Sequence, residues 1–316
     1  DVERTAAGLG ADAAAWRHLF APAVDHAGNL MPELLSDLRH LPRHPLHVAR
    51  FGIPGLLPVT TLASRLFGTD AARALFAGLG AHSMRRLSAP FTSAFGLGMG
   101  VSAHVTGWPV VAGGSGQLAN ALVAHARALG VEIVCGTPLR SLRELPPARA
   151  TLLAITPRQL AELGGDDLPP GYRRRLRTFR YGPGVFKLDY ALAEPVPWRA
   201  AECRTAGTVH VGGTLTELAA SEAEVERGRH SERPFVLAVQ PSVADPSRAP
   251  SGRHILWAYC HVPHGSSLDR SQAIENQLER FAPGFRDRIV RRVNSSPAGL
   301  QARNANLVGG DVVGGS

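Results

Sequence analysis

The sequence predicts a fold of mixed α/β and α+β character. Three observations predict it. The first 90 or so residues have helical periodicity, a glycine turn followed by an amphipathic helix and a β-branched run fills residues 107–142, and short strand candidates separated by loops follow residue 166. The middle unit is expected to pack on a sheet, and such units often lie beside a nucleotide cofactor. The 316 residues are enough for more than one domain.

Residues 1–106 are expected to form the helical part of a substrate domain. The apolar spacing predicts helices over residues 13–26, 31–38, 60–66 and 70–79, the last with Asp70 as its N-cap. Residues 87–106 contain glycines at alternate positions from Gly96 to Gly100. That pattern fits either a helix that tolerates close packing or a buried loop.

Residues 107–165 are expected to form one α/β layer. The glycine cluster Gly113, Gly114 and Gly116 predicts a sharp turn, with Ser115 capping a helix that stops at Gly130. Two apolar runs, residues 131–135 and 151–155, are expected to be strands of one sheet.

The same layer is expected to end with a short helix. Thr156 and Pro157 have the residue types of an N-cap and a first helical position, and Gly164 with Gly165 would stop that helix.

Residues 166–300 are expected to form a mixed sheet with helices against it. The strand candidates are residues 186–192, 208–211, 235–240, 255–260 and 288–294. Residues 217–229 indicate a solvated helix and residues 271–281 an amphipathic one. We expect the helices of residues 1–106 to pack against this sheet more than against residues 107–165.

Composition and charge exclude several classes of protein. The net charge is +8, but only Lys187 of the 34 basic residues is a lysine and the arginines are scattered, so no nucleic-acid partner is expected.

The apolar stretch 51–67 is broken by two prolines and an arginine and is too short to span a bilayer. Three cysteines without CxxC spacing argue against disulfides and predict a reducing, cytoplasmic location. No signal peptide is visible.

Two local motifs indicate chemistry only weakly. Residues 114–119 match G-x-G-x-x-A, but no clear apolar strand precedes them, so a tightly packed helix start is favoured over a pyrophosphate loop. Cys260, His261 and His264 lack a fourth metal ligand, and no metal is expected. Asp189 is expected to pair with Lys187, because residues i and i+2 share a strand face; the pair is structural unless that face lines a cavity.

Several segments together resemble the phytoene desaturase-like FAD/NAD(P)-dependent oxidoreductases, which stand with the flavin amine oxidases in one superfamily. The residues that carry the resemblance are 107–122, 130–133, 137–142, 150–159, 186–198, 257–265 and 304–315. The resemblance as a whole extends over nearly all of the chain. The family's opening strand, G-x-G-x-x-G turn and helix are not found, nor is its closing segment over the flavin, so the chain is expected to be an internal fragment. Residues 301–316 would begin the C-terminal FAD-binding segment, and residues 107–165 would be part of a Rossmann-like FAD-binding layer.

The resemblance implies the site residues. Positions that would contact FAD in the intact parent are Pro138, Leu139, Thr156, Pro157, Gly309, Gly310 and Asp311. An apolar, possibly isoprenoid substrate would meet Gly113, Gly114, Phe91, Phe95, Phe186 and Tyr259. The implied reaction is hydride transfer to or from the flavin, a chemistry that the cofactor itself supplies. No catalytic residue is assigned, and the oligomeric state is left open.

Two other functions stay open on the sequence alone. One is a substrate-domain remnant without redox chemistry that binds lipids or a protein partner, and contact with a membrane surface is compatible with either reading. The other is a nicotinamide-dependent enzyme that uses residues 114–119 directly. The chain alone, without the first βαβ unit, is not expected to hold FAD or to be active.

Overall fold

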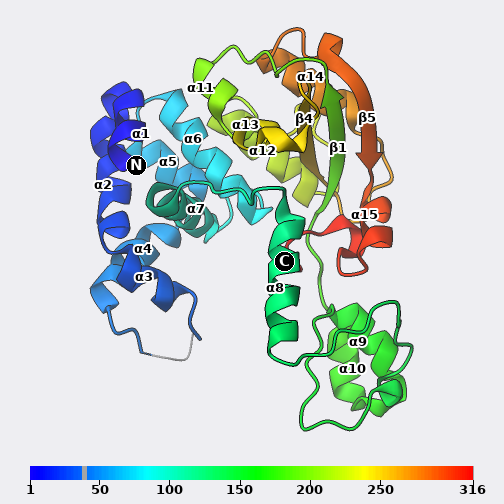
Figure 1. Ribbon diagram of the computed structural model, residues 1–316. Coiled ribbons are helices and arrows are strands. Elements are labelled where there is room, and N and C mark those ends of the chain that lie inside the picture. The colour runs from blue at the N-terminus through cyan, green and yellow to red at the C-terminus, as the bar shows by residue number, and fades with distance from the viewer. Residues whose placement is uncertain (38–40, 316) are drawn as a thin grey trace.

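A computed structural model describes residues 1–37 and 41–315. Its elements form an N-terminal helical bundle, a five-stranded sheet with covering helices, and a separate limb that contains α8 to α10 (Figure 1). The helices are α1 Val2–Gly8, α2 Ala13–Asp25, α3 Ala27–Leu34, α4 Pro45–Gly55, α5 Val59–Leu66, α6 Asp70–Gly80, α7 Thr92–Thr106, α8 Ser115–Ala128, α9 Pro157–Gly164, α10 Pro170–Arg177, α11 Ala201–Thr205, α12 Leu215–Glu226, α13 Pro241–Ala244, α14 Ser271–Phe281 and α15 Pro297–Arg303. The strands are β1 Gly184–Leu192, β2 Thr208–Val211, β3 Val236–Val239, β4 His254–Val262 and β5 Ile289–Ser295.

The sheet has the strand order β2-β3-β4-β1-β5, with every neighbouring pair antiparallel. All five strands lie where the sequence predicts them, within a few residues, and the mixed α+β class is confirmed. Alternation along β1 separates its two faces. Phe186, Leu188 and Tyr190 are buried in a core beneath α14, and Lys187 and Asp189 point to the other side.

The helical bundle is built around an aromatic core. Trp16 and Phe20 of α2 lie with ring centroids 4.5 Å apart and pack near Phe67 and Phe76. A Cβ added at Gly100 would come within 2.3 Å of Phe20, so α7 needs glycine there to approach α2. Residues 92–106 are therefore a helix that permits close packing.

The bundle and the sheet share one core. Leu218 of α12, Phe235 and Leu237 join the bundle's apolar cluster, whereas α8 has no buried residue. The expectation that residues 1–106 pack against the sheet part rather than against residues 107–165 is confirmed. Helix α12 is also less solvated than predicted, because its Leu215, Leu218 and Glu222 are buried.

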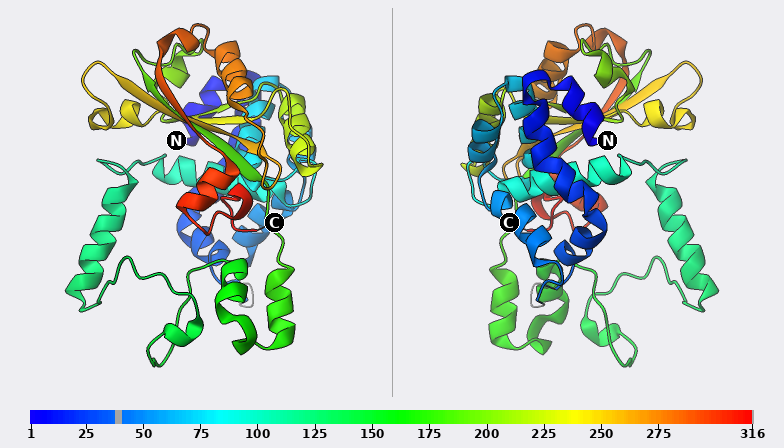
Figure 2. Two further views of the ribbon diagram at one scale, coloured as in Figure 1. Left: turned by 90° about the vertical axis from the view of Figure 1, so that its right-hand side faces the viewer. Right: turned by 90° about the vertical axis from the view of Figure 1, so that its left-hand side faces the viewer.

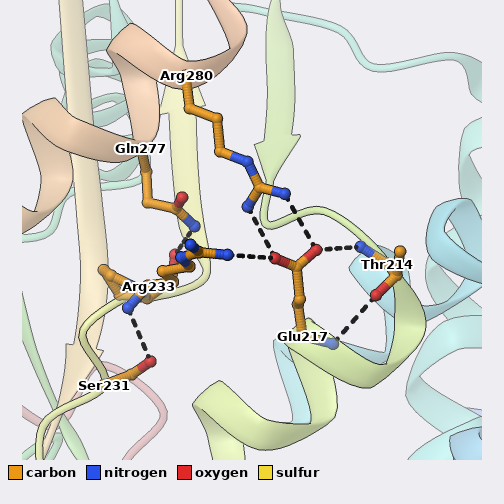
Figure 3. Close-up of polar contacts among 7 residues, drawn as sticks. Thr214, Glu217, Ser231, Arg233, Gln277 and Arg280 are labelled. Atoms are coloured by element: carbon orange, nitrogen blue, oxygen red, sulfur yellow. Dashed lines mark hydrogen bonds and ion pairs between the residues drawn. The ribbon is translucent and has the colours of Figure 1, made fainter.

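Helices α12 and α14 lie on opposite faces of the sheet, and a group of polar side chains connects them (Figure 3). Both oxygens of Glu217 accept hydrogen bonds from Arg280, at 2.9 and 3.2 Å, and Arg233 donates a further one at 3.3 Å. Glu217 also closes a capping box with Thr214 at the start of α12. These bonds lower the pKa of the Glu217 carboxyl to about 2, Arg280 being the largest cause.

The predicted strands 131–135 and 151–155 do not form among the described residues. Neither stretch pairs with a neighbouring strand, and Leu152 is 95% exposed. A strand is stable only when a neighbour takes its backbone hydrogen bonds, and no described strand lies beside either stretch. Figures 1 and 2 show this limb projecting away from the bundle and the sheet.

The predicted helix ends were partly right. Helix α9 begins as expected, with a capping box between Thr156 and Gln159. The N-cap of α6 is Thr69 rather than Asp70, because the Thr69 hydroxyl accepts from the Ala72 N–H. At α8 the N-cap is Gly114, and Ser115 makes no capping bond. The helix expected over residues 31–38 ends at Leu34, and its last predicted residue lies outside the described part.

None of the helices in the described part is both long enough and apolar enough to cross a membrane.

Candidate functional site

The C-terminal glycine segment packs against the junction of β1 and β4. The Gly309 carbonyl accepts the Gly265 N–H at 2.8 Å, and a Cβ added at Gly184 would come within 2.5 Å of the Gly309 oxygen. His264 Nδ1 donates to the Gly182 carbonyl at 3.0 Å. Only glycine permits backbones to approach this closely, so these residue types are required by packing.

Asp311 organises the turn at the end of this segment. Its Oδ1 accepts the N–H groups of Val313 and Gly314 at 2.8 and 3.0 Å. Its Oδ2 accepts those of Gly182 and Gly315 at 2.8 and 2.9 Å. The residue is 1% exposed. Asp311 thus holds the turn against β1, and its oxygens are already engaged within the chain.

The other implied cofactor positions divide into two groups. Residues Thr156–Pro157 lie near the C-terminal segment, because Asn306 donates to the Ala154 carbonyl at 3.3 Å. Tyr181, just before β1, accepts the Arg158 N–H at 3.1 Å and ties the start of α9 to the same place.

Pro138 and Leu139 lie apart from that place, in the exposed, unpaired stretch between α8 and α9. The structure therefore brings Thr156, Pro157, Gly309, Gly310 and Asp311 into one neighbourhood, and leaves Pro138 and Leu139 outside it.

The open face of β1 carries a cation beside aromatic rings. Lys187 and Asp189 form an ion pair, as the i, i+2 spacing predicts. The Lys187 Nζ lies 5.6 Å from the centroid of the Trp257 ring, and Trp257 stacks with Tyr259 at 6.1 Å. In the β1–β4 register, Tyr259 lies opposite Lys187 and Trp257 opposite Asp189. We call these four residues the lysine face.

Two residues of the lysine face, Asp189 and Trp257, line a small cavity; Lys187 and Tyr259 lie outside its lining. Asp189, Trp257 and Val293 of β5 take part in its lining, and its volume is about 220 Å³. Lys187 is only partly exposed, at 27% of its side chain. The Lys187–Asp189 ion pair therefore lies beside a cavity, which is the condition set above for a role beyond structure. Sequence reasoning missed Trp257; the alternation of β4, read against the register with β1, is the signal that identifies it.

A larger, mainly apolar cavity of about 800 Å³ lies between the bundle and the edge strand β2. Its walls come from α6, the end of α7 with Trp108, β2 and the segment around α11. Representative lining residues are Leu75, Leu79, Trp108, Val209, His210 and Leu218. Helices before residue 106 and sheet residues after 166 are the walls that the sequence suggests for a substrate pocket, but none of the six implied pocket residues lines this cavity.

Those six residues lie in separate places. Phe186 is 2% exposed within the core under α14, on the sheet face away from the bundle, so it cannot wall a pocket there. Tyr259 belongs to the lysine face. Phe91 and Phe95, at the start of α7, are 60% and 46% exposed.

Gly113 and Gly114 contact the α13 region instead. The Gly113 N–H donates to Asp245 at 2.7 Å, and a Cβ added at Gly114 would meet the Arg248 guanidinium at 1.8 Å. A carboxylate therefore already occupies the place where a pyrophosphate oxygen would sit, and no described strand leads into this turn. The turn at Gly113–Gly114 therefore does not fit the pyrophosphate of FAD or of a nicotinamide dinucleotide.

The Cys260 region has no metal geometry. Cys260 is buried, and burial raises the pKa of its thiol to about 12. His261 Nδ1 instead hydrogen-bonds Glu222 at 2.7 Å, with both side chains buried. Across residues 1–37 and 41–315, no group of three or more His, Cys, Asp or Glu side chains could hold a metal ion.

Comparison with solved structures places this fold among oxidoreductases. No protein-family model matches the chain. An oxidoreductase from Methanosarcina mazei matches 84% of this chain with 15% identity and a TM-score of 0.51, over 62% of its own length. A single and a triple mutant of putrescine oxidase, both from a redesign of cofactor binding, match 89% of this chain and 61% of their own, with 14% identity and TM-scores of 0.51 and 0.52.

This chain is therefore similar in fold to oxidoreductases such as putrescine oxidase. At 14–15% identity they show the fold alone. This chain spans about 60% of the length of the structures it matches.

Proposed function

We propose that this chain supplies the substrate-binding part of an FAD-dependent oxidoreductase of the dehydrogenase or desaturase type. The intact protein would act on an apolar substrate, with isoprenoids as the candidate class, by hydride transfer to or from flavin. The fold shared with oxidoreductases supports the class, and the phytoene desaturase-like segments of the sequence support the subclass. The turn at Gly113–Gly114 does not fit a pyrophosphate, so residues outside the described part would hold most of the FAD.

The lysine face is the observation that carries this proposal. The bundle covers the β2–β4 half of the sheet, whereas Asp189 and Val293 line the cavity at the other half and Lys187 keeps 27% of its side chain exposed. This open half adjoins the glycine segment, because Gly184 at the start of β1 contacts Gly309. A cation held over an aromatic wall favours negative charge that develops in front of it. Trp257, at the border between the covered and the open half, adds a flat apolar wall to the cavity.

The chain's own residues have definite tasks in this proposal. Asp189 fixes the position of the Lys187 ammonium, which can donate hydrogen bonds toward the open side. The cavity between the bundle and β2 offers a mainly apolar volume of about 800 Å³, which lies in the range that small-molecule sites occupy.

The test compares this chain with the longer gene product, purified with excess FAD and freed of unbound flavin by gel filtration. We expect no stoichiometric flavin absorbance with the 316-residue chain. We expect a flavin spectrum with the longer product, bleached anaerobically by an apolar substrate. A longer product that binds no flavin would refute the proposal.

The lysine face gives a sharper prediction. In the flavin-containing protein, Lys187→Met should slow the bleaching step by roughly 10- to 100-fold, because a preorganised charge is lost. Flavin content should not change. The matched control, Arg4→Met on the exposed side of α1, should leave the rate unchanged. Equal rates in the two variants would remove Lys187 from the reaction.

The alternative is a module without redox chemistry that binds a lipid or a protein partner. The exposed apolar side chains of residues 107–156, such as Leu118, Leu122 and Leu129, favour it. Peripheral membrane contact belongs to either proposal and is supported by Leu46, Ile53 and Leu56, whose side chains on and next to α4 are more than half exposed. A cytoplasmic location also remains a proposal.

A further inference from the structure

A third cavity lies inside the helical bundle, away from the sheet. Its volume is about 430 Å³, and α2, α3, α4, α5 and α7 supply its walls. The apolar lining includes Leu19, Pro22, Leu30, Phe51, Leu62 and Leu97. This volume falls in the range of sites for single small ligands. Nothing in the proposed redox function uses this cavity.

The polar residues of the same cavity are all basic. His18, His26, His47 and Arg50 line it, and none of the described lining residues is acidic. Arg50 has no carboxylate partner within ion-pair distance in the described part of the chain. A guanidinium without an ion-pair partner among the described residues places a positive charge at this cavity.

The histidine rings are stacked, and one nitrogen lacks a partner. His47 stacks on His26 with ring centroids 4.2 Å apart, and on its other neighbour His44 at 5.7 Å. The His47 Nδ1 is buried without a hydrogen bond. Buried polar atoms are nearly always bonded in folded proteins, so this nitrogen calls for an external partner.

The electrostatic setting agrees with an anion. Burial lowers the pKa of His47, and the neighbouring His26, His44 and Arg50 lower it further. An anionic group among these side chains would relieve their mutual repulsion and accept their N–H donors.

We propose that this cavity binds a small amphiphile with one apolar tail and an anionic carboxylate or phosphate head. The tail would lie against the leucine, proline and phenylalanine side chains. The head would lie at the mouth, between Arg50 and the stacked histidines. The mouth is open to such a ligand, because Arg50 and His26 are exposed while Leu30 and Leu97 are buried.

Calorimetric titration of the 316-residue chain tests this directly. The probes are decanoate, decyl phosphate, decanol and inorganic phosphate, each below its micelle concentration. We expect at least one of the two anionic amphiphiles to bind ten times more tightly than decanol, and inorganic phosphate to bind far more weakly than either. The two anions distinguish a carboxylate from a phosphate head. Equal affinity for decanol and both anions would overturn the proposal.

Variants assign the two parts of the site. Arg50→Met keeps the aliphatic stem and His47→Phe keeps the ring stack, so both should weaken anion binding at least fivefold and leave decanol binding unchanged. Ala23→Leu fills the cavity and should weaken every amphiphile. Arg4→Met serves as the control. Circular dichroism verifies folding, and Arg50, being exposed, keeps the test valid if a buried variant fails to fold. Unchanged decanoate and decyl phosphate affinities in Arg50→Met would reject the site.

Discussion

At the scale of single residues, Asp311 is expected to contribute to stability, although it lies in a glycine-rich segment near the end of the chain. Four backbone N–H groups converge on its carboxylate. Asp311→Ala leaves the buried Gly182 N–H without an acceptor and removes three partly buried bonds, so the free energy of unfolding should fall by about 1–3 kcal/mol. Urea unfolding measures this. Asp287→Asn, at an exposed position, should change it by less than about 0.5 kcal/mol. A small effect at Asp311 would mean that the turn is not held by its carboxylate.

Glu217 is a second single residue with a measurable role. Its folded-state pKa of about 2 lies below the ordinary value of 4.5, so its stabilisation is full above pH 4.5 and is lost as the pH falls toward 2. Glu217→Gln should lower the free energy of unfolding at pH 7 by about 1 kcal/mol, because solvent at Arg280 screens the pair. Glu3→Gln breaks an exposed pair with Arg17 and should change almost nothing. Equal losses in the two variants would contradict this difference.

At the scale of elements, buried histidines join the bundle to the sheet. His82 Nε2, after α6, lies 3.0 Å from His210 Nε2 on β2, and one must accept as a neutral ring. Burial is the main cause that lowers the pKa of His82 to about 4 and of His210 to about 3, and His261 lowers both further. His104 accepts from the Trp16 indole N–H at 3.1 Å, and burial lowers its pKa to about 4.

These histidines predict acid sensitivity at the interface. The unfolded chain binds protons near pH 6.5 and the folded chain only near pH 4, so stability is constant above 6.5 and falls as the pH drops from 6.5 toward 4. The slope should approach about 1.4 kcal/mol per pH unit for each histidine. Urea unfolding at pH 7, 6 and 5 measures it. His82→Gln should flatten the profile; an unchanged slope would exclude this pair as its origin.

The limb between α7 and β1 should be the least protected element. Helix α8 has no buried residue, and residues 131–155 form no strand in the described structure. Few contacts hold this backbone, so hydrogen exchange there should be complete long before exchange in β1 or β4. Mass spectrometry of peptic fragments measures the difference. Protection of residues 131–155 equal to that of β4 would show that a partner covers them.

At the scale of the whole molecule, the sequence predicted the strands whose hydrogen-bonding partners lie within the same chain. The strands of the sheet were found because each apolar run pairs with another run in the same chain. Residues 131–135 and 151–155 have equally good strand composition but no neighbour, and composition cannot reveal that. The walls of the cavity beside β2 agree with the sequence, but its lining residues and the other two cavities were not predicted, because no motif marks side chains that only folding brings together. His47 and Arg50 illustrate this: no motif marks them, and only folding brings them beside α2.

The lysine face has one practical consequence. Lys187 is the only lysine in the chain, so apart from the terminal amine an amine-reactive dye has one target. The yield of labelling at that one position reports how accessible the open half of the sheet is, in any preparation and without mutagenesis. Any ligand, domain or second protein that binds over β1 should lower the labelling yield at Lys187, which can be measured on the one peptide that contains it.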